Sequence, residues 1–80
     1  MTSKELIQRS EEIYVSRLKA ELERTHRDYF VVIEPESGDH FLGRTLSDAS
    51  AAAHAVYPDR RGFALRVGHR AAVHIGAINS

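Results

Sequence analysis

Hydrophobic and polar residues alternate with a helical period over residues 3–25, a stretch that contains neither glycine nor proline. At 100° per residue, the apolar side chains gather on one face of this helix while glutamates and a lysine occupy the rest. Thr2 and Glu5 have the spacing of a capping box, in which each side chain bonds the backbone of the other residue. The pattern predicts an amphipathic helix whose apolar stripe includes Ile7, Tyr14, Leu18 and Leu22.

The apolar stripe needs a surface to cover it. Ile7 and Tyr14 are seven residues apart, but Glu21 occupies the next heptad position, so a long coiled coil is not indicated. A helix about 30 Å long has two ways to bury its stripe: it packs on a sheet of its own chain, or it pairs with another protomer. The second alternative predicts a homodimer or a complex with a partner protein, held through Tyr14, Leu18 and Leu22.

The pattern changes to that of β structure after residue 28. Residues 29–34 are β-branched and aromatic up to Glu34, which predicts a central strand. Residues 35–39 begin with proline and contain Gly38, as in a hairpin loop. Residues 40–44 then form the returning strand.

A second helix and a second hairpin follow. Thr45 is a good N-cap for an alanine-rich helix that ends before Tyr57 and Pro58. Residues 63–67 alternate as a half-buried strand, with Arg66 on the face opposite Phe63. The turn at residues 68–70 leads to a last strand at 71–75. The whole order predicts one α+β domain over residues 1–80: a leading helix, then a β-β-α-β-β body over residues 28–76 with a small antiparallel or mixed sheet.

Composition limits the possible environments. The chain has 80 residues and no cysteine, which excludes disulfides, thiolate metal sites and a cysteine nucleophile and fits a reducing compartment. No segment is apolar over a length that would cross a bilayer, and the first residues lack the apolar core of a signal peptide. We therefore expect a cytoplasmic protein without membrane contact.

The charges balance overall but are unevenly distributed. Residues 1–39 carry six basic and nine acidic side chains, whereas residues 40–80 carry five arginines and two aspartates. This excess predicts an anion-facing surface at Arg66, His69 and Arg70, which would receive an acidic partner or a phosphate. An alternative is binding of RNA or DNA by an edge formed by Arg60, Arg61, Arg66 and Arg70. A solvated, charged edge that prevents strand pairing gives the same pattern.

The sequence contains few residue patterns that would support catalysis. His69 and His74 are five residues apart and would need His40 or His54 to form a metal site, yet no helical or carboxylate-containing metal motif accompanies them. The serines lack the flanking glycines of a nucleophile elbow. We expect no enzyme activity, no cofactor and no bound metal.

Several segments together are similar to a known group. The run from Phe30 to Ala49, with Ser37-Gly38-Asp39 inside it, is followed by Tyr57-Pro58-Asp59 and Arg66-Val67-Gly68-His69. These segments resemble small uncharacterised bacterial proteins and look similar to antitoxin-like partner proteins encoded beside a toxin or protease gene. Arg70 replaces a proline frequent in that group. A weaker likeness is to antitoxins with a degraded RNase-H-like fold, whose third strand before the helix is missing here. The resemblance implies a non-enzymatic interaction module, antitoxin-like or inhibitory, that binds a partner protein.

Overall fold

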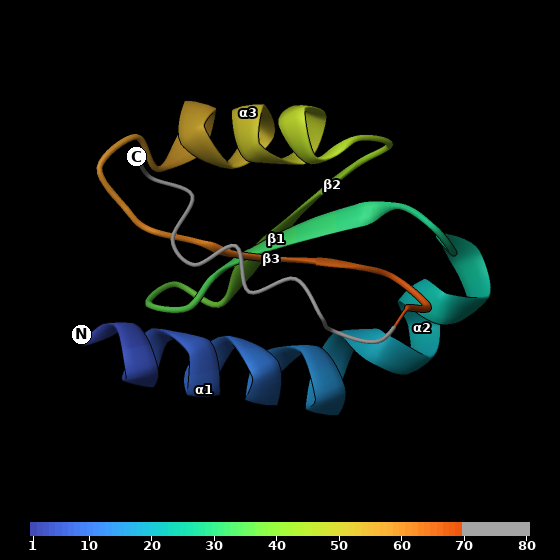
Figure 1. Ribbon diagram of the computed structural model, residues 1–80, viewed down its shortest axis with the longest axis horizontal. Helices are drawn as coiled ribbons and strands as arrows, with labels where there is room; N and C mark the ends of the chain where they lie inside the picture. Colours follow the sequence, from blue (N-terminus) through green and yellow to red (C-terminus); the bar gives the residue numbers. More distant parts are fainter. Residues whose placement is uncertain (70–80) are drawn as a thin grey trace.

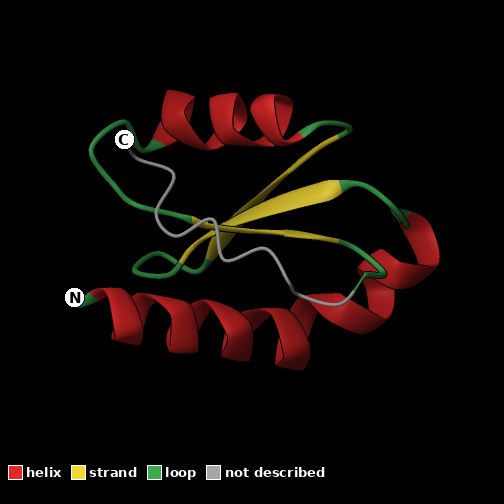
Figure 2. Ribbon diagram, viewed as in Figure 1, coloured by secondary structure: helices red, strands yellow, loops and turns green. Residues whose placement is uncertain are grey.

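The computed structural model describes residues 1 to 69 and shows a three-stranded antiparallel sheet between two helical layers (Figures 1 and 2). The predicted α+β class is confirmed. The last predicted strand, at residues 71–75, lies outside the described residues. Within residues 1 to 69, no helix is long and apolar enough to cross a membrane. The elements in chain order are α1 (Ser3–Ile13), η1 (Tyr14–Leu18), α2 (Lys19–Thr25), β1 (Phe30–Glu34), β2 (Asp39–Gly43), α3 (Leu46–Val56) and β3 (Phe63–Arg66).

The leading helix is continuous but not uniform. The predicted capping box is present: Glu5 N donates to Thr2 Oγ1 over 3.1 Å, and Thr2 N donates to Glu5 Oε1 over 2.9 Å. In the middle, η1 is a π-helical segment, which accommodates one residue more than an α-helical turn. In a regular α-helix Glu21 lies about 20° and Leu22 about 80° around the axis from Tyr14. The extra residue brings Leu22 closer into line with Tyr14 and leaves Glu21 exposed.

β1 is the central strand, as predicted, and the strand order is β2-β1-β3. Both neighbours run antiparallel to it, with Val32 opposite Phe41 on one side and Ala64 on the other. Successive side chains of β1 point to opposite faces of the sheet. Val31 and Ile33 join the larger core under α1, η1 and α2, and Val32 joins the smaller core under α3.

The alanine-rich helix α3 approaches the sheet closely. Thr45 Oγ1 accepts a hydrogen bond from Asp48 N over 3.0 Å, as its N-cap position predicts. Ala49 is fully buried beside Gly43, where a Cβ atom would lie 2.4 Å from Ala49 N. Only glycine therefore fits at this contact. Ala53 packs against the same core as Ala49, whereas Ala51, Ala52 and Ala55 are exposed.

Candidate functional site

The helix residues that we predicted to bind a partner are mostly buried inside this chain. Tyr14 and Leu22 are 8% and 5% exposed in the larger core, and Leu18 packs against that core while partly exposed. Burial raises the pKa of the Tyr14 phenol, as does the charge of Glu23. Burying an apolar side chain of this size contributes about 1.5–3 kcal/mol, so a partner would have to replace that contribution. Of the two alternatives, the helix packs on its own sheet; Tyr14 and Leu22 are not available for association.

The predicted edge of four arginines is not continuous in the described residues. Arg60 Nη1 lies 2.9 Å from Glu34 Oε1, and the guanidinium of Arg61 donates to Ser3 Oγ and to the carbonyl oxygen of Met1. Both arginines precede β3, whereas Arg66 ends it, about 10 Å beyond the first residue of the strand. Arg60 and Arg61 therefore have structural partners of their own. Arg70 lies outside the described residues.

Arg66 and His69, in contrast, converge on one residue. His69 Nε2 lies 2.6 Å from Asp28 Oδ1, and Arg66 Nε donates to the backbone oxygen of Asp28 over 3.3 Å. The Arg66 guanidinium also lies over the Phe30 ring, 5.4 Å from its centroid. This arrangement follows from the register, which places Phe30 opposite Arg66 on the α3 face. We call the four residues Asp28, Phe30, Arg66 and His69 the Asp28 corner.

A distorted turn aims the Asp28 side chain at this corner. Asp28 has φ 71°, the left-handed region that usually favours glycine. Its N–H donates to Val67 O over 3.0 Å, and Val67 N donates to Tyr29 O over 2.8 Å, so two residues oppose one as in a G1 bulge. Sequence reasoning missed Asp28 and Phe30. Their signal was an aspartate just before a strand, which alone does not distinguish a turn from a bulge.

The corner brings one carboxylate together with a guanidinium and an imidazole. The hydrogen bond from His69 lowers the pKa of Asp28 below its ordinary value, and the charges of His69, Arg66 and Arg27 lower it further. Asp28 and His69 remain exposed, with 61% and 46% of their side-chain surface open. Among residues 1 to 69, no carboxylate lies within 4.0 Å of the Arg66 guanidinium. An exposed, ring-stacked guanidinium with no carboxylate partner is suited to bind an external anion.

A second arginine–aromatic pair lies on the other face of the sheet. The Arg44 guanidinium lies 5.4 Å from the centroid of the Tyr29 ring, and the His26 ring meets the same ring edge-on at 5.0 Å. Tyr29 directly precedes β1, so its side chain faces α2 rather than α3. This pair is therefore separate from the Asp28 corner.

A polar cleft between α3 and β1 has a structural role. Glu34, which lines it, is 3% exposed and accepts hydrogen bonds from the backbone N–H groups of Glu36 and Ser37 and from Arg60. Burial alone would raise the pKa of Glu34, but these bonds and the Arg60 charge outweigh it, so the pKa lies below its ordinary value. The cleft measures about 20 Å³, room for one water beside the unpartnered hydroxyl of Ser50. The hydrogen bonds of Glu34 fix the hairpin turn, and the cleft is too small for a ligand.

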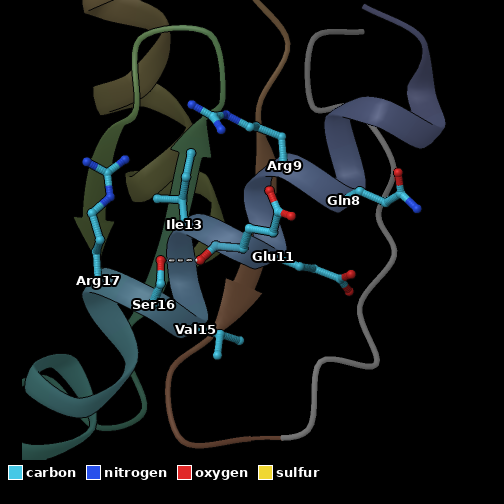
Figure 3. A pocket seen from close by; sticks show the side chains of 8 residues that line it. Gln8, Arg9, Glu11, Ile13, Val15, Ser16 and Arg17 are labelled. Carbon is cyan, nitrogen blue, oxygen red and sulfur yellow. Dashed lines mark hydrogen bonds between the residues drawn. The ribbon is translucent and has the colours of Figure 1, made fainter.

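A hollow of about 960 Å³ follows the outer surface of the leading helix (Figure 3). All eight residues that line it belong to α1 and η1, including the exposed Val15 and Ser16, whose hydroxyl donates to Glu12 O over 2.6 Å. Charges of both signs alternate along it, so it presents no focused chemistry. Among residues 1 to 69, no group of three or more histidine or carboxylate side chains is placed to hold a metal ion.

Comparison with known proteins finds no match: no family model, no curated protein and no solved structure is significantly similar to this chain.

Proposed function

We propose that the protein is a small non-enzymatic interaction module, antitoxin-like or inhibitory, that binds an acidic segment of a partner protein at the Asp28 corner. Binding there is steric and electrostatic: the partner's carboxylates pair with Arg66 and its surface covers His69. No bond is made or broken. The resemblance to antitoxin-like bacterial proteins, seen in the residue pattern, agrees with this role.

The observation that carries the proposal is the left-handed backbone of Asp28. An L-residue with a side chain at φ 71° is less favourable than glycine there, yet the chain has aspartate at this position. Its carboxylate receives His69, and its carbonyl oxygen receives Arg66. Residues in such conformations are frequent at functional sites, where a strained turn holds side chains in place. The turn thus holds the side chains of Arg66 and His69 next to each other, and both are exposed to solvent.

The alternative of nucleic-acid binding has weaker support. It requires several arginines along one edge, but Arg60 pairs with Glu34 and Arg61 bonds Ser3 and Met1 before β3 begins. Arg66, at the end of β3, is the one described member of that set at the Asp28 corner. A single guanidinium gives few phosphate contacts, and affinity for nucleic acid depends on their number. We therefore prefer an acidic protein segment as the ligand. A gel-shift assay with RNA and DNA at low ionic strength separates the two ligand classes.

The test is recovery of a partner from the source cells with tagged wild-type protein, Arg66→Glu and Arg9→Glu. Arg9 is an exposed arginine of α1, away from the corner, so its reversal changes the net charge equally. We expect mass spectrometry to find a partner with wild type and Arg9→Glu that is at least tenfold depleted with Arg66→Glu, about 1.4 kcal/mol or more. Equal recovery with Arg66→Glu would exclude the corner as the binding surface.

A further inference from the structure

Two tight turns lie side by side at the end of the sheet that carries the Asp28 corner. Residues 26–29 form the first and residues 66–69 the second; in each, the N–H of the fourth residue donates to the carbonyl oxygen of the first, over 3.1 Å and 3.2 Å. The third residues, Asp28 and Gly68, have φ of 71° and 84°, as in a type II turn. Asp28 N also donates to Val67 O, so the two turns are joined through their backbones.

Arg27, the second residue of the first turn, adds a guanidinium next to the corner. A Cβ atom on Gly68 would lie 3.1 Å from Arg27 Cγ and 3.5 Å from Arg27 Cζ, so the arginine packs on the bare glycine backbone. Arg27 is exposed, and no carboxylate among residues 1 to 69 lies within 4.0 Å of its guanidinium. Together with Arg66, it sets two permanent positive charges around the one carboxylate of Asp28.

These charges favour a carboxylate at the position that Asp28 occupies. The hydrogen bond with His69 lowers the pKa of Asp28, and the charges of His69, Arg66 and Arg27 lower it further. The surroundings of His69 therefore stabilise a negative charge. Arg66 uses Nε for the backbone oxygen of Asp28, so its two terminal nitrogens have no carboxylate from residues 1 to 69.

We propose that the Asp28 carboxylate is a tethered competitor of the partner: in the free protein it holds the place at His69 that a carboxylate of the acidic segment takes on binding. This inference rests on the proposed function, because it concerns the same surface. Displacing Asp28 costs little, since an exposed ion pair such as that of Asp28 with His69 contributes little to stability. The incoming segment gains charge-assisted hydrogen bonds from Arg66 and Arg27.

The tether determines which ligands succeed. A carboxylate held on the chain competes at an effective concentration in the millimolar range, so an isolated carboxylate such as acetate does not displace it at lower concentrations. A segment with several adjacent carboxylates pairs with the two arginines and replaces Asp28 at His69 in the same event. The corner therefore selects clustered acidic side chains over single ones.

Fluorescence anisotropy with a labelled hexaglutamate peptide measures this competition. Asp28→Gly removes the carboxylate at a position whose φ of 71° glycine adopts freely, so the turn persists. We expect Asp28→Gly to bind the peptide about threefold or more tighter than wild type, because the competing state is removed. Glu12→Gln is the control: it removes one negative charge from the exposed surface of α1 and should bind as wild type does.

A second variant and a second measurement keep the test independent of the glycine. Asp28→Asn keeps an acceptor for His69 but removes the charge, so its affinity should lie between those of wild type and Asp28→Gly. In isotope-labelled wild type, the side-chain carboxyl carbon of Asp28 should move toward the chemical shift of a free aspartate as the peptide is added. A carboxyl resonance that stays constant at saturation would show that Asp28 is not displaced.

Arg66→Glu separates this inference from the proposed function. If Arg66→Glu loses the peptide while Asp28→Gly binds it no more tightly than wild type, the corner is the binding surface and Asp28 is not a competitor. If Arg66→Glu binds the peptide as well as wild type does, the proposed function fails together with the inference. Absence of binding by Asp28→Gly would also overturn the inference.

Discussion

Two carboxylates, Glu34 and Asp28, show how single residues serve different purposes in this chain. Glu34 is almost fully buried and bonds two backbone N–H groups and Arg60, so it fixes the turn after β1. Asp28 is exposed, lies in a left-handed conformation and holds His69. The first carboxylate stabilises the fold, and the second organises a surface.

Replacing Glu34 with glutamine should destabilise the protein and alter its response to acid. At pH 7 we expect Glu34→Gln to lower the free energy of unfolding by about 1.5–3 kcal/mol, because hydrogen bonds to a charged group are lost. The folded pKa of Glu34 lies below the ordinary value of 4.5. The stability that its charge contributes is therefore complete above that value and is lost as the pH falls through the lowered pKa.

Urea unfolding between pH 3 and pH 7 measures both effects. The exposed neighbour Glu36 is the control: Glu36→Gln should change the free energy of unfolding by no more than about 0.5 kcal/mol. The difference between wild type and Glu34→Gln should shrink toward acid pH. A difference that stays constant across this range would mean that the Glu34 charge contributes nothing.

Substitutions at Asp28 should follow the preference of a left-handed backbone. Glycine adopts this conformation freely and asparagine tolerates it, so both variants should unfold within about 1 kcal/mol of wild type. Asp28→Val, with a β-branched side chain, should lose about 1–3 kcal/mol. Urea unfolding gives the order, and the ring nitrogen shifts of His69 report the lost contact in Asp28→Gly. Equal stability of the valine variant would show that the bulge is absent.

The sequence predicted these residues unequally. The alternation of Phe63, Leu65 and Val67 was enough to place Arg66 on the opposite, exposed face. Nothing local distinguished Arg66 from Arg60, because the partner of Arg60 is a buried carboxylate 26 positions earlier in the chain. Contacts between distant segments decide which arginines remain available, and single-sequence periodicity does not report them.

At the scale of elements, the π-helical segment η1 explains the interrupted heptad of the leading helix. Glu21 occupies the expected apolar position, which interrupts the heptad pattern. At 100° per residue Leu22 already lies on the apolar stripe, and the extra residue of η1 brings it closer into line with Tyr14. Helix existence and caps were predictable from local pattern. The π segment was not predictable in this way, because the sheet that packs against the helix determines which of its residues must face the core.

Removing one residue from η1 should therefore be tolerated. Deletion of Ser16, which is exposed, makes Tyr14 and Leu22 seven residues apart and lets a regular α-helix present both to the core. We expect this variant to retain cooperative thermal unfolding. Deletion of Gln8 in α1 is the control, because it rotates Leu6 by about 100° away from the core. If both deletions unfold the protein equally, the inserted-residue interpretation is wrong.

In the whole molecule, the sheet lies between surfaces that could each bind a partner. The helices α1 and α3 cover its two faces, β2 provides an open edge, and the Asp28 corner lies beyond the end of β3. The α+β class and the central position of β1 followed from hydrophobic pattern. The order β2-β1-β3 did not, because strand pairing depends on how loops return the chain, and the predicted fourth strand lies outside the described residues.

Chemical-shift mapping tests the central claim most directly, because it requires no substitution. The isotope-labelled protein is titrated with the acidic partner recovered from the source cells, and backbone amide shifts are followed residue by residue. We expect the largest changes at Asp28, Phe30, Arg66 and His69, with small changes along the outer surface of α1. Changes concentrated on α1 or on β2, with the corner unaffected, would contradict the proposal that the Asp28 corner is the binding surface.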